Sequence, residues 1–467
     1  MVDHLVKNFN ELIGNAFDEV DRKARSVALT LLEEAVKASD PRIAVRRCVK
    51  LSKNRKSLAV GNATFNLEKS GRVFVVGAGK ASGAMAEEME KLLGDMISEG
   101  CVSILRGTRS MFNTERIELH ESNHPIPNSD SLEATKRILS ILDTAGPSDL
   151  IICLISGGGS ALLCLPPDEV PLEDLETVIR SLQKLGTNIN ELNTVRKHLS
   201  QVKGGRLAEK ATSRGCTMVT LVVSDVVGDP LDVIASGPTA PDSTRYKDAI
   251  EVLKRRNLWN DMPESARQHL LKGFNGEIPE TPKSESSVFS HVHNYIIGSC
   301  RQACNAAYTK ARELDLNSIV LSTMVEGEAK EVGKFIAAVA KELATHGSPI
   351  NKPAAVIMGG ETTVTVLGTG RGGRNQELAL SASKSIEGLE GVVIGSMGTD
   401  GVDGPTDAAG GIVDSHILTN ARLKGIDPLD YLSRNDSNTF FKKLGDGIII
   451  TGPTGTNVND IMVIVAL

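Results

Sequence analysis

Short apolar segments alternate with amphipathic helices along most of the chain. In the first half, apolar segments at 72–76, 101–105 and 150–155 are separated by helical patterns at 81–93 and 131–142. Strands that are apolar throughout are typical of a parallel sheet with helices on both faces. We therefore predict an α/β fold whose first domain holds a Rossmann-like parallel sheet, with ligands bound beyond the carboxyl ends of its strands.

The alternation restarts after a turn-rich segment at 273–290, which is the best candidate for a linker. Two closely spaced strand patterns, at 354–358 and 362–367, favour antiparallel pairing. We predict two α/β domains, at 1–275 and 286–467. The second is expected to be smaller, to hold a mixed sheet, and to form with the first an interdomain cleft that closes around the ligand.

Three further segments shape the expected fold. Apolar residues at three- and four-residue steps predict one long amphipathic helix over the first forty residues, ended by Asp40 and Pro41. Another helical region is expected from Pro171 to about 211. After the next strand, at 218–223, comes a long loop at 224–244, and loops of this length usually carry function.

Composition restricts the partners of the chain. Of its 467 residues, 40% are hydrophobic and 24% are charged, as in soluble globular proteins. The net charge of −6 and the aromatic content of 3% argue against nucleic-acid binding, which needs basic surfaces and stacking rings. No apolar stretch is as long as a bilayer span, and the seven cysteines show no disulfide-type pairing. We predict a cytoplasmic protein without nucleic-acid or membrane partners, and the sequence leaves a homodimer open.

A glycine-rich turn around Lys80 follows the strand at 72–76 and opens a helix. Free backbone N–H groups at such a turn, which includes Gly79, favour an anion. A Walker A loop would need Ser or Thr at Ala81, and a dinucleotide fingerprint would need Gly at Ser82, so neither motif fits. We predict that Lys80 faces a phosphate or carboxylate, and a tight turn with a solvated lysine is the alternative.

The segment Ser156-Gly157-Gly158-Gly159-Ser160 follows the most apolar strand of the first half. Three successive glycines let a polyphosphate approach the backbone. A nucleophile elbow around Ser160 would need Gly where Leu162 stands, so that motif is excluded. We predict a phosphate cradle here, with a flexible turn as the alternative.

Asp225 comes at the end of the strand at 218–223. Carboxylates at strand ends of α/β enzymes bind Mg²⁺ or accept a hydroxyl proton, so Asp225 is the candidate metal ligand or base. Asp229 precedes a proline and is expected mainly to shape the turn. His124 and His198 are the two histidines beside candidate loops, and we interpret both as structural.

In the second half, Arg371 and Arg374 lie in a glycine-rich frame before a helix. Guanidinium groups there match the oxygens of carboxylates and phosphates. The alternative for Arg374 is a local ion pair with Glu377 at i,i+3. A later strand end carries three acids, of which the second and third are equally well explained as solvated turn residues. They are Asp400, Asp403 and Asp407.

These glycine turns, cations and carboxylates are the groups that phosphoryl transfer needs. The sequence also resembles the glycerate 2-kinase family, whose members carry a C-terminal MOFRL domain, here at about 350–465. The resemblance extends from about residue 12 over nearly the whole chain, and the segments that carry it are 75–86, 156–163, 189–208, 222–242, 359–366, 368–380, 398–411 and 435–467.

The resemblance implies transfer of the γ-phosphate of ATP to the 2-hydroxyl of D-glycerate, giving 2-phosphoglycerate and ADP with Mg²⁺ or another divalent cation. The residues that match those suspected of catalysis in the family are Lys80, Asp225, Arg371 or Arg374, and Asp400. Candidates for substrate or nucleotide contact are Gly79, Ser156, Gly157, Gly158, Gly159, Ser160, Asn193, Arg196, Lys203, Glu361 and Asn375.

Two other functions stay open at this point. One is a nicotinamide-dependent hydroxypyruvate reductase, against which the missing dinucleotide fingerprint argues. The other is a regulator that binds a sugar acid or nucleotide without turnover, which would need the glycine turns but not the carboxylates. Production of ADP, oxidation of NADH, or binding alone distinguishes the three.

Overall fold

The computed structural model describes residues 4–68 and 71–467. The chain forms two compact units, which we call the central unit (Pro41–Ile297) and the terminal unit (Met1–Asp40 with Gly298–Leu467). This division differs from the predicted one at 275–286. The start of the chain packs with its C-terminal part, and β9 (Val292–Gly298) is a strand of the central sheet.

The central unit holds a six-stranded sheet in the order β6-β5-β4-β7-β8-β9. Renumbered along the chain, this is the doubly wound order 3-2-1-4-5-6, and every register determined between its strands is parallel. The order reverses between β4 and β7, and ligands of such sheets bind beyond the carboxyl ends at that point. The Rossmann-like prediction is confirmed. The other strands are β4 (Val73–Ala78), β5 (Ile97–Leu105), β6 (Ile117–Ser122), β7 (Leu150–Ser156) and β8 (Thr217–Val223).

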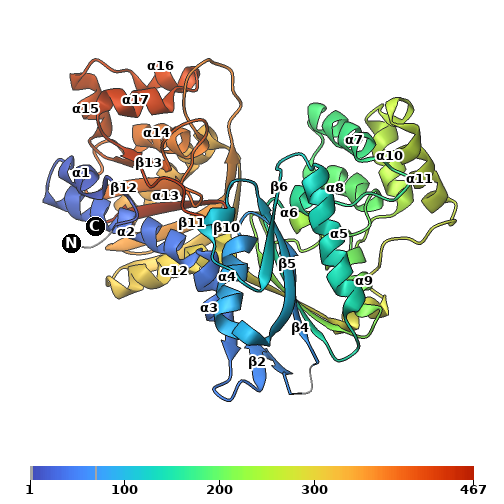
Figure 1. Cartoon of the computed structure of the whole chain (residues 1–467). Helices are drawn as coiled ribbons and strands as arrows, with labels where there is room; N and C mark the ends of the chain where they lie inside the picture. The colour runs from blue at the N-terminus through green and yellow to red at the C-terminus, as the bar shows by residue number, and fades with distance from the viewer. Residues whose placement is uncertain (1–3, 69–70) are drawn as a thin grey trace. The chain divides into compact units, whose positions relative to one another are not determined.

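Helices cover both faces of this sheet. Figure 1 shows α4 (Ser82–Leu93), with α3 (Pro41–Cys48) beside it, on one face, and α5 (Ser129–Thr144) and α9 (Arg206–Thr212) on the other. Strands β4 and β7 are buried along their whole length, which explains why their sequences are apolar without alternation. A small antiparallel sheet was not predicted, and its strands are β1 (Val49–Leu51), β2 (Ser57–Val60) and β3 (Ala63–Asn66).

The helical region expected from Pro171 to 211 is broken into separate helices. Gly186, with a φ angle of 61°, follows the first of them, and Gly205, with a φ angle of 84°, is the N-cap of α9, so the chain cannot continue as one helix through these positions. Two of the resulting helices pack with two later ones around an apolar core of their own. The helices of this region are α6 (Gly159–Leu162), α7 (Leu172–Lys184), α8 (Ile189–His198), α10 (Tyr246–Arg255) and α11 (Glu264–Phe274).

The terminal unit holds a sheet in the order β10-β11-β15-β12-β13-β14. The sheet is mixed, as the sequence predicts. Only β10 and β11 pair in parallel; the last strand of the chain, β15, lies antiparallel between β11 and β12. The antiparallel pairing therefore does not come from the two strands expected at 354–367, which are one strand, β11, followed by a loop. The strands are β10 (Asn317–Glu328), β11 (Ala354–Thr363), β12 (Val392–Gly398), β13 (Gly410–Asp414), β14 (Ile448–Ile449) and β15 (Asp460–Ala466).

In the terminal unit, α2 (Glu19–Ala38) and α12 (Cys300–Glu313) lie on one face of the sheet, and α13 (Ala329–His346) and α14 (Arg374–Ile386) on the other (Figure 1). The single N-terminal helix expected from the sequence is two helices, because Asp18 caps the start of α2: its carboxylate accepts from the N–H of Asp21 at 2.8 Å. The remaining helices are α1 (Phe9–Gly14), α15 (Ile417–Leu423), α16 (Pro428–Ser433) and α17 (Ser437–Leu444).

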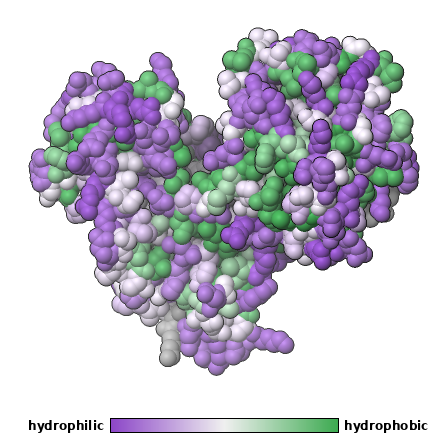
Figure 2. Space-filling view, turned by 180° about the vertical axis from the view of Figure 1, so that it is seen from behind, coloured by the Kyte–Doolittle hydropathy of each residue, from purple (hydrophilic) through white to green (hydrophobic). Residues whose placement is uncertain are grey.

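Hydrophilic and hydrophobic residues are interspersed over the face of the molecule shown in Figure 2. Among residues 4–68 and 71–467, no helix combines the length and the apolar character that a membrane crossing requires.

Candidate functional site

The turns after β4 and β7 are bonded to each other at the switch point of the central sheet. The backbone N–H of Lys80 donates to the carbonyl of Gly157 at 2.9 Å, and the hydroxyl of Ser156 accepts from the N–H of Ala81 at 3.0 Å. Gly79 has φ +147°, and a Cβ atom added to it would lie 2.0 Å from Oγ of Ser156. Glycine is required here because the two turns approach this closely.

Each glycine of the triglycine turn lies against a different neighbour. A Cβ atom added to Gly157 would lie 1.9 Å from Oδ2 of Asp225. One added to Gly158 would lie 3.1 Å from both Cδ2 of His124 and Cγ of Lys80, and one added to Gly159 would lie 2.7 Å from Cβ of an alanine in the loop after β8. The turn thus brings Asp225, His124 and Lys80 together from the ends of β8, β6 and β4.

Two cations near this turn have no carboxylate partner. Lys80 is exposed, and Arg196, on α8, is half-buried; within the described part of the chain neither side chain has a hydrogen bond or ion pair assigned to it. Burial lowers the pKa of Arg196 to about 10; the thiol of Cys164 acts in the opposite direction, but no carboxylate does. An uncompensated guanidinium is costly to bury, so this region is electrostatically prepared for an anion.

Lys203 lies deeper, with 3% of the residue exposed. Its ammonium group donates to the carbonyl oxygens of Ser160, at 2.8 Å, and of Leu163. Burial, with the neighbouring Arg196 acting in the same direction, lowers the pKa of Lys203 to about 8. Through these two hydrogen bonds, Lys203 stabilises the segment that follows the triglycine turn.

Asn193 is also part of the supporting structure. Its amide oxygen accepts from the hydroxyl of Ser236 at 3.0 Å, and its amide nitrogen donates to Val233 at 3.2 Å. The hydroxyl of Ser236 lies 2.8 Å from that of Ser160. These bonds fix the loop after β8, in which Ala235 and Ser236 both have positive φ angles, of 51° and 63°.

In the terminal unit, Arg374 is paired with two acids. Its guanidinium lies 2.7 Å from Oε1 of Glu361 and 2.6 Å from Oδ2 of Asp460. Burial raises the pKa of Asp460 to about 6, although Arg374 acts against this rise. The local pair with Glu377 weighed from the sequence does not form; the second partner comes instead from β15, where Asp460 lies opposite Gly360 of β11.

Asp403 is a structural residue. It is almost completely buried, and its carboxylate accepts from the backbone N–H groups of Asn375 and Gln376, at 3.0 and 2.9 Å, at the start of α14. Asn375 is also buried, and its amide oxygen accepts from Ser396 at 2.6 Å. Asn375 therefore holds the helix start from inside and does not face solvent.

Arg371 and Asp400 remain accessible. Arg371 is exposed and donates to the carbonyl of Pro405 at 3.0 Å. Asp400 is partly exposed and accepts from the backbone of Val402 at 3.0 Å. A pocket of about 640 Å³ in this unit is lined by Arg374, Asp400 and the glycine-rich frame. The third acid of the cluster, Asp407, forms an ion pair with Lys442, at 2.8 Å, as a turn residue at the surface does.

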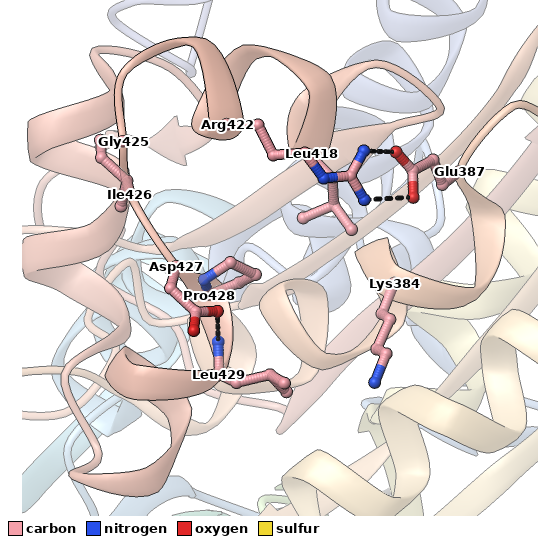
Figure 3. Close-up of a pocket in the computed structure, with 9 residues that line it drawn as sticks. All are labelled: Lys384, Glu387, Leu418, Arg422, Gly425, Ile426, Asp427, Pro428 and Leu429. Atoms are coloured by element: carbon pink, nitrogen blue, oxygen red, sulfur yellow. Dashed lines mark hydrogen bonds and ion pairs between the residues drawn. The ribbon is translucent and has the colours of Figure 1, made fainter.

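Another pocket of the terminal unit, of about 540 Å³, lacks a comparable set of groups (Figure 3). Its Arg422 is paired twice with Glu387, so the charges of both groups are already satisfied.

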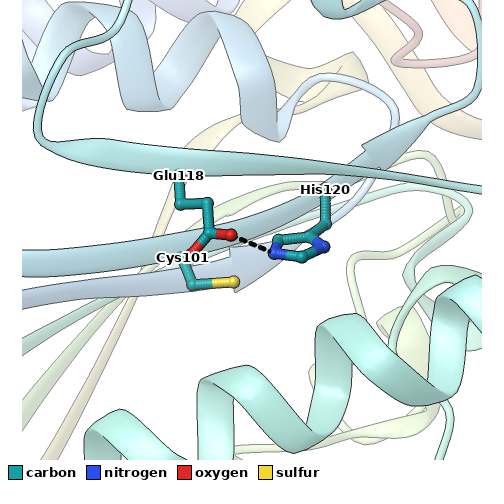
Figure 4. A group of neighbouring side chains, drawn as sticks. All are labelled: Cys101, Glu118 and His120. Atoms are coloured by element: carbon teal, nitrogen blue, oxygen red, sulfur yellow. Dashed lines mark hydrogen bonds and ion pairs between the residues drawn. The ribbon is translucent and has the colours of Figure 1, made fainter.

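Three potential metal ligands, Cys101, Glu118 and His120, lie together on β5 and β6 (Figure 4). Burial and the nearby Glu118 raise the pKa of the Cys101 thiol to about 12, so it is protonated. Glu118 also accepts a hydrogen bond from the guanidinium of Arg137 at 3.0 Å. The negative charge of Glu118 is therefore already compensated by Arg137, without a metal ion. The group is explained as part of an ion-pair network.

The structure thus brings Lys80, the triglycine turn and Asp225 together beyond the carboxyl ends of the central strands, with Arg196 of α8 nearby. Arg374 and Asn375 already have polar partners within the terminal unit, so neither is free to bind an anion. His124 was interpreted as structural but lies at the site. It follows β6 by two residues, so the rule that ligands bind at strand ends could have identified it.

The fold is that of a doubly wound α/β protein, and the cations and the carboxylate near its switch point are of the kind that suits an anionic ligand. The description "Domain of unknown function (DUF4147)" matches residues 27–271, and "MOFRL family" matches residues 354–460. Glycerate 2-kinase of Pyrococcus horikoshii is 43% identical over 440 residues, which cover 94% of this chain and 96% of the relative.

D-glycerate 2-kinase of Thermotoga maritima is 45% identical over 392 residues, which cover 84% of this chain and 90% of the relative. A crystal structure of glycerate kinase from the same organism matches with a TM-score of 0.84 and 42% identity, over 94% of this chain and 99% of the other. The chain belongs to the glycerate kinase family that carries a MOFRL domain.

Proposed function

We propose that the protein is an ATP-dependent glycerate 2-kinase, which transfers the γ-phosphate of ATP to the 2-hydroxyl of D-glycerate. The observation that carries this proposal is the set of groups around the triglycine turn: two cations without acidic partners, Lys80 and Arg196, and the carboxylate of Asp225. The names and the extent of similarity of the relatives support the same reaction.

These groups suit the two anionic parts of the reaction. Lys80 and Arg196 would hold the substrate carboxylate or the transferring phosphoryl oxygens, because a positive charge that is already in place costs no rearrangement as the transition state forms. The open backbone at Gly157 and Gly158 would let a phosphate approach closely. Lys203 and Asn193 would keep the turn in position through the hydrogen bonds described above.

Asp225 would serve as the metal ligand or as the base. Its carboxylate is partly exposed and lies against Gly157, and carboxylate oxygens are ligands that Mg²⁺ prefers. The residues present therefore fit a divalent cation. A cation held there would neutralise charge on the phosphate oxygens.

The terminal-unit residues would contribute in two different ways. Asp400 and Arg371 are accessible candidates for nucleotide or substrate contact. Arg374 and Glu361, tied to each other and to Asp460, would position the ends of β11 and β15 and the start of α14. A cytoplasmic location is consistent with the seven cysteines, all of which are free thiols.

The test is a phosphorus NMR time course of the purified protein with ATP, Mg²⁺ and D-glycerate. Growth of the 2-phosphoglycerate signal is expected. The 3-phosphate in its place would keep the kinase but overturn the assigned hydroxyl. Absence of both products, with oxidation of NADH in the presence of hydroxypyruvate, would overturn the kinase in favour of the reductase.

A further inference from the structure

We propose that His124 is a substrate-binding residue whose uncharged imidazole accepts a hydrogen bond from a hydroxyl group of the hydroxy acid. The proposal rests on the proposed function, because it takes a hydroxy acid as the substrate class. It assigns to His124 the recognition of the hydroxyl and to the neighbouring cations the recognition of the carboxylate.

The position of His124 supports this role. A Cβ atom added to Gly158 would lie 3.1 Å from Cδ2 of His124 and 3.2 Å from Cε of Lys80, so the imidazole and the lysine chain border the same glycine. They arrive from the ends of two different strands, β6 and β4. Asp225 borders the neighbouring Gly157. The imidazole is therefore a wall of the same site.

Burial and the positive charges around the imidazole ring of His124 keep it neutral. His124 is half-buried, and burial, Lys80 and Arg196 all lower its pKa, to about 4. No acid acts on the ring in the opposite direction. A neutral imidazole has one N–H donor and one nitrogen that accepts. Within the described part of the chain, no hydrogen bond is assigned to either ring nitrogen, so the acceptor is available to a ligand.

The chemistry of a hydroxy acid matches these groups. Its carboxylate is attracted by the two cations, Lys80 and Arg196, neither of which can accept a hydrogen bond. Its hydroxyl can donate a hydrogen bond, and a neutral imidazole supplies an acceptor that does not repel the nearby carboxylate. A site that hydrogen-bonds a substrate hydroxyl discriminates against analogues without it, because its own polar group is then left unpaired.

The test compares ligands with and without hydroxyl groups by titration calorimetry. We would measure D-glycerate, D-lactate, 3-hydroxypropionate and propionate against wild type, His124→Leu and His124→Asn. His124→Leu is expected to weaken D-glycerate binding about 3- to 10-fold, the value of one net hydrogen bond, and to leave propionate binding unchanged within twofold. His124→Asn, which keeps an acceptor, is expected to recover part of the loss. The two monohydroxy acids show which hydroxyl is bound.

A matched control is His120→Leu, the same replacement on β6 at a surface ion pair outside the site, with no expected effect on D-glycerate. Equal weakening of D-glycerate and propionate by His124→Leu would overturn the proposal in favour of a structural role, and so would unchanged D-glycerate binding. Binding of D-glycerate without phosphoryl transfer would overturn the kinase function alone, whereas failure of wild type to bind it would overturn both.

Discussion

Replacing Gly157 by alanine should displace Asp225 without unfolding the protein. The added Cβ would lie 1.9 Å from Oδ2 and 2.4 Å from Cγ of Asp225. Ordinary van der Waals contact begins at about 3.4 Å, so the carboxylate must move by roughly 1 to 1.5 Å. Gly157 is not among the positive-φ residues, so alanine brings no backbone strain of its own. The effect should therefore act mainly through the acid.

We expect Gly157→Ala to lower kcat about 100-fold, because a displacement of about 1 Å in a catalytic group costs that much. The loss of stability should stay near 1 kcal/mol, since the clash involves the movable end of a side chain. The assay is ADP release by coupled spectrophotometry, with urea unfolding alongside. Gly14→Ala, where nothing lies within 4 Å of the new atom, is the matched control. Wild-type kcat in Gly157→Ala would refute the position assigned to Asp225.

Three further outcomes are expected. Lys80→Ala should keep wild-type stability in urea, since the side chain is exposed, and lose about 100-fold or more in kcat, so near-normal ADP release would exclude Lys80 from the mechanism. Arg25→Met should lower the free energy of unfolding by about 3–5 kcal/mol, because buried Arg25 lies 2.7 Å from Asp414 and 2.8 Å from Asp446. The control Arg22→Met, at an exposed ion pair, should lower it by less than about 1 kcal/mol, and equal losses in the two variants would contradict this prediction. Because the pKa of His124 is lowered in the folded state, the unfolded chain binds more protons than the folded one between pH 6.5 and about 4, and the free energy of unfolding falls on acidification through that range. His124→Leu should therefore lose less stability than wild type between pH 7 and pH 5.

The central sheet could be predicted because its signals are local. Strands β4 and β7 are buried on both faces and so are apolar throughout, and the glycine turns follow them directly. β6 was harder to detect, because it alternates buried and accessible residues and includes Glu118 and His120. The role of His124 depends on the neighbours that β4 and α8 supply, and these are 44 and 72 residues away in the chain.

Long-range pairing explains most of the differences in the terminal unit. The local pair of Arg374 with Glu377 was a reasonable expectation from i,i+3 spacing. The observed partner Asp460 lies on β15, 86 residues further on, and comes close only because the last strand inserts between β11 and β12. The N-terminal helix α2 joins this unit through the buried Arg25 and its pairs with Asp414 and Asp446. Spacing along the chain carries no information about such pairs.

The two units differ in how their cations are compensated, and this difference separates ligand binding from support. Arg374 is neutralised by Glu361 and Asp460, and its pKa is raised because these acids outweigh the effect of burial. Arg196 has no such acid, and its pKa falls. A buried cation without a counterion is costly unless an anion from outside supplies it. Of these two arginines, Arg196 is therefore the one that an anionic substrate would stabilise, whereas Arg374 is satisfied before any ligand arrives.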